Sequence, residues 1–104
     1  MSALLAPPDR GWKGGKDHAA ALARLDALIG SEGESPERNA LRAEVRAAAG
    51  RYSSAVEDAE RAVELAPKSA RALAALGRAL ARAGRLEEAL PRLEAALKVA
   101  PGTP

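Results

Sequence analysis

Apolar side chains recur three and four positions apart through most of the chain, the spacing that places them on one face of an α-helix. Glycine and proline interrupt this pattern at intervals, and each interruption marks the end of a helix. The pattern predicts five helices joined by short turns. They cover residues 17–30, 36–49 and 53–66, the stretch between Ser69 and Gly84, and the stretch from there to about Ala100.

Two serines are placed to start helices. Ser35, followed by Pro36 at the first turn, and Ser69 can each accept a backbone hydrogen bond as an N-cap. Pro91 lies near the start of the last helix, where its missing N–H predicts a bend rather than a break. In the second helix we expect one apolar face, made of Leu41, Val45 and Ala48.

Composition supports an all-α protein. The apolar residues are mostly alanine, leucine and valine, with one tryptophan, one tyrosine and no phenylalanine, which suits closely packed helices better than a sheet. The net charge of +2 is too small to indicate a nucleic-acid binder by itself, and the absence of cysteine excludes disulfides and thiolate metal sites. Residues 1–16 contain two prolines and three glycines, and we interpret them as an extended arm.

One stretch of sequence occurs twice. AGRYSSAVEDAERAVELAP at 49–67 is followed, thirty-four positions later, by AGRLEEALPRLEAALKVAP at 83–101. The Ala-Gly-Arg opening, the interior alanines and the closing Ala-Pro stand at matching offsets. An internal period of this length is the mark of a helical repeat protein.

The period and its small residues resemble the tetratricopeptide repeat family. The residues that fit the family pattern are Ala43, Ala55, Ala62 and Pro67 in one copy, and Gly77, Ala89, Ala96 and Pro101 in the next. The resemblance implies a right-handed α-solenoid of antiparallel helix hairpins. It divides the chain into the arm 1–16 and a single domain over 17–101, made of a half repeat 17–35 and repeats 36–69 and 70–103.

Two features depart from the family pattern. Arg42 and Arg46 occupy positions that are usually apolar, which indicates that their helix is rotated or one residue out of register. Gly15, Ala20 and Ala27 keep the offsets of a second half repeat whose first helix is missing. The arm stands where that helix would be.

The resemblance implies that the first helices of the repeats line a concave groove that holds protein segments. The groove residues expected to bind a partner are Arg71, Arg78, Arg82, Arg85, Glu37 and Glu44. Arginine suits planar carboxylates, so we expect the arginines to bind an acidic segment of a partner. Alternatively they form a solvated face, or they pair with the acidic helix that contains Glu57, Asp58, Glu60 and Glu64.

Two further surfaces are candidates for contact. Leu90 and Leu97 correspond to Val56 and Val63, yet no following helix covers them, so we expect them to meet a second copy of the chain or a larger protein. Trp12 either packs against the first helix of its own chain or anchors a partner.

The sequence therefore predicts a non-catalytic protein-interaction module, an adaptor or assembly factor without cofactor or metal. One alternative is RNA or polyanion binding through the arginines and the basic arm residues Arg10, Lys13 and Lys16. Another is a purely structural subunit of a larger complex. No leader or membrane-spanning run is evident, so we expect a cytoplasmic protein without membrane insertion.

Overall fold

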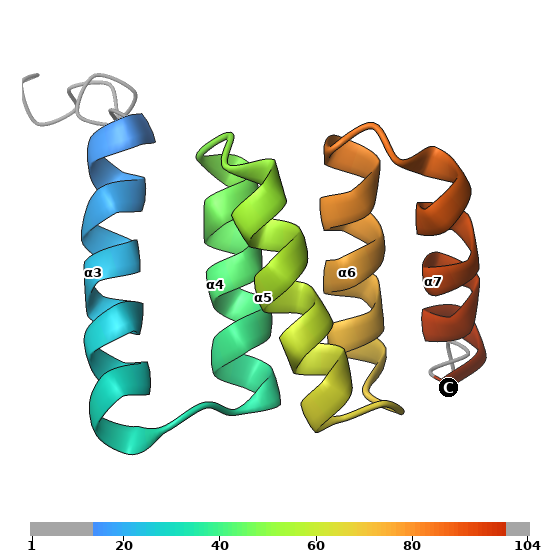
Figure 1. Cartoon of the computed structure of the whole chain (residues 1–104), viewed down its shortest axis with the longest axis horizontal. Helices are drawn as coiled ribbons and strands as arrows, with labels where there is room; N and C mark the ends of the chain where they lie inside the picture. The colour runs from blue at the N-terminus through green and yellow to red at the C-terminus, as the bar shows by residue number, and fades with distance from the viewer. Residues whose placement is uncertain (1–13, 100–104) are drawn as a thin grey trace, which may run out of the picture.

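The structure is a computed structural model that describes residues 14–99, and within this range it contains five α-helices and no strand (Figure 1). The helices are α3 (Gly14–Glu32), α4 (Pro36–Ala48), α5 (Tyr52–Leu65), α6 (Ala70–Arg82) and α7 (Leu86–Val99). Successive helices run antiparallel and pack on their neighbours. The prediction of an all-α helical-repeat solenoid is thus confirmed.

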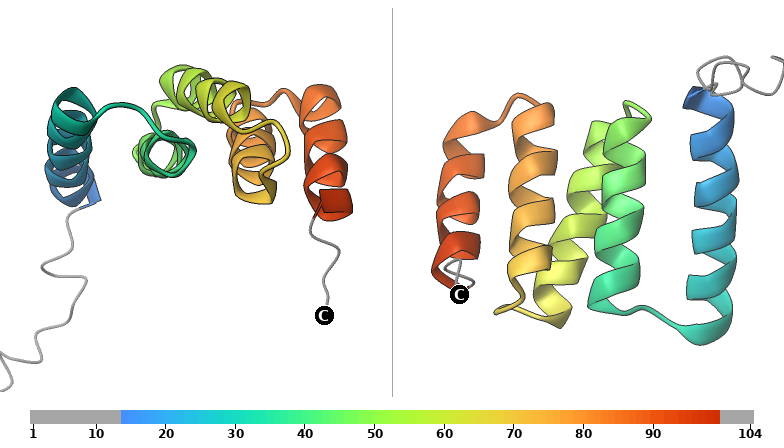
Figure 2. Two further views of the ribbon diagram at one scale, coloured as in Figure 1. Left: turned by 90° about the horizontal axis from the view of Figure 1, so that it is seen from below. Right: turned by 180° about the vertical axis from the view of Figure 1, so that it is seen from behind.

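The helices of the two complete repeats form two layers. α4 and α6 lie side by side, and α5 packs on both of them from one side, as the view from below shows (Figure 2). α7 packs against α6 at one end, and α3 packs against α4 at the other. The outer side of α4 and α6 is therefore left for a groove.

The helix ends follow from local chemistry. The hydroxyls of Ser35 and Ser69 accept hydrogen bonds from the backbone N–H groups of Arg38 (3.0 Å) and Ala72 (3.1 Å), so both predicted N-caps are confirmed. Gly50 and Gly84 both have a φ of 84°, a left-handed conformation that favours glycine after the last helical turn. The two hairpin turns are therefore built alike, thirty-four residues apart.

Alanine makes up most of the core between the two layers. Ala40, Ala55, Ala59 and Ala62 are all fully buried, so the helices approach closely. Gly77 lies at a close contact with α7, because a Cβ there would lie 2.6 Å from the Cγ of Leu93. Small residues at the expected repeat positions thus set the spacing between helices.

The bounds of α3 differ from the prediction. The helix begins at Gly14 instead of Asp17, so the last three residues of the predicted arm are helical. It passes through Gly30 and ends at Glu32, where Gly33 (φ 93°) donates its N–H to the carbonyl of Ile29 at 2.8 Å. Glycine lowers helix propensity by only about 1 kcal/mol, which neighbouring residues can offset, so Gly30 does not end the helix.

The predicted apolar face of α4 was wrong. Leu41 is 41% exposed and Ala48 is exposed, whereas the buried side carries Asn39, Ala40, Ala43 and Ala47. Asn39 and Ala43 correspond to Leu73 and Gly77 on the buried side of α6, so α4 keeps the register of the repeat at these positions. The register holds because the two arginines at usually apolar positions find a buried counter-charge.

That counter-charge is Asp58 of α5, which is 5% exposed. Arg42 holds it with two hydrogen bonds, from Nε at 3.2 Å and Nη2 at 3.1 Å, and Arg46 donates from Nη1 at 2.8 Å. Arg42 also reaches Asp26 of α3 at 2.7 Å, so one guanidinium links three helices. Burial alone would lower the pKa of Arg42, but its hydrogen bonds to Asp58 and Asp26 outweigh this effect and raise it.

α7 continues through Pro91 without a break, as expected. Among the described residues, none of the helices is long and apolar enough to cross a bilayer.

Candidate protein-binding groove

Three exposed arginines of α6 form the arginine stripe, which we define as Arg71, Arg78 and Arg82. All three side chains are exposed and come from α6 at spacings of seven and four residues, so they share one face of that helix. Ser69 fixes the start of α6 and Gly84 its end, which places this face beside α4.

Glu44 of α4 pairs with two members of the stripe. Its two carboxylate oxygens accept hydrogen bonds from Nη2 of Arg71 at 3.2 Å and from Nη2 of Arg78 at 3.1 Å. Both arginine side chains remain about half exposed, and among the described residues no ion pair is found for Arg82. One carboxylate therefore faces three cations, which leaves the stripe with a surplus of two positive charges.

The floor between the stripe and α4 is small and apolar. A shallow hollow of about 70 Å³ is lined by Ala43, Glu44, Ala47, Ala75, Arg78, Ala79 and Arg82. The alanines place the two backbones close together, so the hollow has room for a few side-chain atoms only. A ligand would therefore lie along the surface and contact the arginine heads.

The structure bears on one alternative for the stripe, its pairing with the acidic helix α5. Its arginines pair with Glu44 of α4, not with the acidic helix α5. Asp58 of that helix is occupied by Arg42 and Arg46. Glu37 is exposed on α4, and no ion pair joins it to the stripe within residues 14–99.

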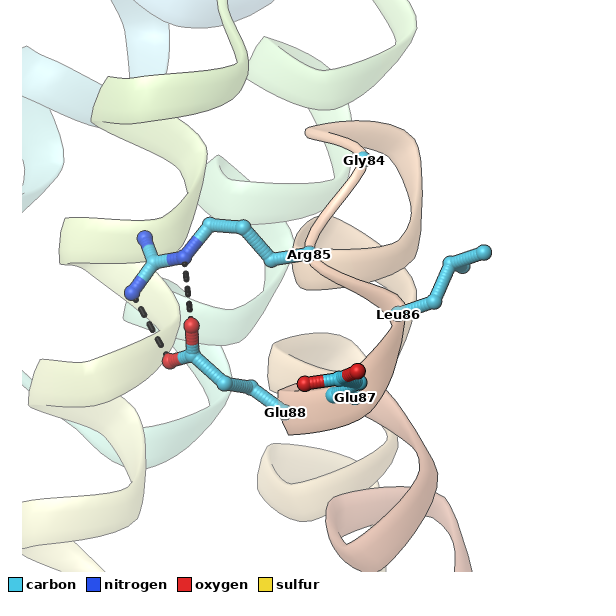
Figure 3. A pocket seen from close by; sticks show the side chains of 5 residues that line it. All are labelled: Gly84, Arg85, Leu86, Glu87 and Glu88. Atoms are coloured by element: carbon cyan, nitrogen blue, oxygen red, sulfur yellow. Dashed lines mark hydrogen bonds and ion pairs between the residues drawn. The ribbon is translucent and has the colours of Figure 1, made fainter.

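Arg85 does not join the stripe. It lies at the turn before α7 and points toward Glu88 in the first turn of that helix (Figure 3). Its Nε and Nη2 donate to the two carboxylate oxygens of Glu88 at 3.0 and 2.9 Å. This bidentate pair raises the pKa of Arg85 and lowers the pKa of Glu88. A hollow of about 320 Å³ beside the pair is lined by Gly84, Arg85, Leu86, Glu87 and Glu88.

The two other predicted surfaces have different outcomes. Leu90 and Leu97 are 59% and 68% exposed on the outer face of α7, together with Leu86. Trp12 lies outside the described residues, as do Arg10 and Lys13. In the part of the chain that the structure describes, no three His, Cys, Asp or Glu side chains are placed to hold a metal ion.

Comparison with known families agrees with this architecture. Two models of the tetratricopeptide repeat match the chain, one over residues 12–67 and the other over residues 46–104, so each covers more than half of it. The chain belongs to the tetratricopeptide repeat family. A search of curated proteins found no match. Tetratricopeptide repeats generally mediate protein–protein interaction.

Proposed function

We propose that this tetratricopeptide repeat protein is a non-catalytic adaptor or assembly factor that binds an acidic segment of a partner along the arginine stripe. The observation that carries the proposal is the charge surplus of the stripe over a floor of alanines. Arginine heads in this arrangement favour carboxylates, because their planar fork matches a carboxylate with two parallel hydrogen bonds.

The spacing of the stripe indicates the form of the ligand. At 1.5 Å of rise per residue, Arg71 and Arg78 lie about 10 Å apart along α6, and Arg78 and Arg82 about 6 Å apart. An extended peptide advances about 3.3 Å per residue, so acids three and then two positions apart would meet the three arginines. The ligand is thus an extended segment of the form Glu-x-x-Glu-x-Glu.

A labelled peptide of this form, with serine at the x positions, tests the proposal by fluorescence anisotropy. The double variant Arg78→Ala, Arg82→Ala should weaken binding roughly five- to thirty-fold, since two exposed ion pairs contribute about 1 to 2 kcal/mol together. Arg92→Ala removes the same charge from an exposed position on α7 and serves as the control. Equal weakening by both changes would contradict the proposal.

Glu44 provides an independent test, because it competes with the ligand for two arginines. Glu44→Gln should strengthen binding of the acidic peptide about two- to five-fold, the range that an exposed ion pair contributes. A general attraction to anions would instead give tight, sequence-independent binding of a short single-stranded RNA. If that RNA bound more tightly than the peptide, with a steep dependence on salt, polyanion binding would replace this proposal.

For the outer face of α7 we propose weak self-association between two copies of the chain. Leu86, Leu90 and Leu97 form one exposed apolar face, with Glu87 in the first turn of the helix and Lys98 in the last. Two such faces packed antiparallel would bring the acidic end of each helix toward the basic end of the other.

Light scattering over a range of concentrations tests self-association. The parent protein should form a dimer as its concentration rises, and the double variant Leu90→Glu, Leu97→Glu should stay monomeric. Leu65→Glu, at an exposed leucine of α5, is the matched control. A parent protein that remains monomeric at millimolar concentration rules out self-association through α7.

A further inference from the structure

An open apolar hollow of about 440 Å³ lies between α3 and α4, at the end of the solenoid opposite α7. It is lined by Ala21, Arg24, Leu25, Leu28, Leu41 and Val45. Leu28 is 37% exposed and Leu41 is 41% exposed, although both are large apolar residues. The hollow is larger and far less polar than the alanine-lined floor between the arginine stripe and α4.

The repeat itself shows that this face of α4 is one that should be covered. Thirty-four residues after Leu41 and Val45 stand Ala75 and Ala79, each 2% exposed in the repeat that packs on α4. α4 therefore covers Ala75 and Ala79 of α6, whereas the equivalent residues of α4, Leu41 and Val45, line the open hollow. One repeat length before α4 (Pro36–Ala48) lie residues 2–14. This segment is to α4 in sequence what α4 is to α6.

We propose that the N-terminal arm, residues 1–13, docks in this hollow and covers the open face of α4 with Leu4, Leu5 and Trp12. These residues lie outside the described part of the chain. Pro7, Pro8 and Gly11 disfavour a helix there, so the arm binds as an extended segment. Leu41 and Val45 are larger than the alanines at the equivalent positions of α6. They keep the backbone of a docked segment farther from α4, which leaves room for large side chains on that segment.

The arm is long enough to reach the whole hollow. Leu28 lies about 21 Å along α3 from Gly14, at 1.5 Å per residue. Leu5 precedes Gly14 by nine residues, which span about 30 Å when extended. Trp12, two residues before the helix, can reach the near end of the hollow, and Asp9 supplies an acid for Arg24. Because the arm is tethered, its effective concentration at the hollow is in the millimolar range, well above that of a separate ligand.

Trp12 is the only tryptophan of the chain, so its fluorescence reports on the arm directly. In the full chain the emission of Trp12 should be shifted to the blue, and its indole should be less quenched by acrylamide, relative to a free peptide of residues 1–16. Leu41→Glu places a charge in the hollow and should return both values to those of the peptide. Leu97→Glu, at an exposed leucine on the far end, should leave them unchanged.

A second measurement does not depend on how well the charged variant folds. The chain has no cysteine, so the pair Leu4→Cys and Leu28→Cys should form an intramolecular disulfide, whereas Leu4→Cys with Leu97→Cys should not. Emission of the parent protein equal to that of the free peptide would overturn the proposal. So would protection that persists in Leu41→Glu, or a cross-link found only between two chains.

Discussion

Replacing Asp58 with alanine should destabilise this fold more than a typical surface substitution does. The carboxylate is 5% exposed and receives three hydrogen bonds from Arg42 and Arg46. Its removal leaves two guanidinium groups beside the α4–α5 interface with their shared counter-charge gone. A buried charge without a partner costs more than the net contribution of the pair, because desolvation is no longer offset.

The magnitude follows from how far the arginines can reach water. Breaking a buried ion pair costs about 3 to 5 kcal/mol when the remaining charge cannot be solvated. The side chains of Arg42 and Arg46 are 17% and 22% exposed, and Arg42 keeps its contact with Asp26, so the loss should be at or below the lower limit of this range. We expect a loss of about 2 to 3 kcal/mol, which lowers the Tm of a domain of this size by about 10 to 20 °C.

Urea unfolding followed by circular dichroism at 222 nm measures this loss, with Glu57→Ala on the exposed side of α5 as the control. Adding Arg42→Leu and Arg46→Leu to Asp58→Ala should restore most of the stability, since Leu76 and Leu80 occupy the equivalent positions of the next repeat. If Asp58→Ala cost no more than Glu57→Ala, or if the added leucines lowered stability further, the reasoning would be refuted.

Three further predictions concern single sites. Gly77→Ala should cost about 1 to 2 kcal/mol in the same assay, because the energetic cost of the overlap between its Cβ and Leu93 exceeds the gain in helix propensity. Adding Leu93→Ala should relieve the overlap, since the first repeat has alanine at both equivalent positions, Ala43 and Ala59. Asn39 is 1% exposed, and within residues 14–99 neither polar atom of its amide has a hydrogen-bond partner, so Asn39→Leu should stabilise by about 1 to 3 kcal/mol. A loss of stability would reveal a partner for the amide. Glu88 should titrate by NMR at a lower pH than is ordinary for glutamate, and Arg85→Ala should remove that difference. This pair contributes stability above the ordinary pKa of glutamate and loses it as pH falls through the lowered pKa.

The parts of the fold that depend on local sequence could be predicted from it. Ser35 and Ser69 cap helices, and Gly50 and Gly84 end them, through bonds within a few residues. The Asp58 network could not be predicted in this way, because Arg46 and Arg42 lie twelve and sixteen residues before Asp58 and belong to another helix. Comparing the repeats would have revealed a signal: Arg42, Arg46 and Asp58 change together to Leu76, Leu80 and Arg92.

The candidate site was predictable to a similar extent. The shared face of Arg71, Arg78 and Arg82 follows from helical spacing alone. The direction of Arg85 does not, since it depends on the turn at Gly84 and on the nearby carboxylate of Glu88. The role of Glu44 as a bridge between two arginines also required the distance between α4 and α6.

The two repeats place opposite charges at equivalent groove positions. Glu37 and Glu44 of α4 correspond to Arg71 and Arg78 of α6, thirty-four residues later. At these positions α4 carries acids and α6 carries bases, and the Glu44 pairs join the two helices. A partner with only acidic residues can satisfy the α6 side alone. A partner that also carries a basic residue on its opposite edge would meet Glu37, and this second contact would fix its orientation across the groove, because the reversed orientation places like charges together.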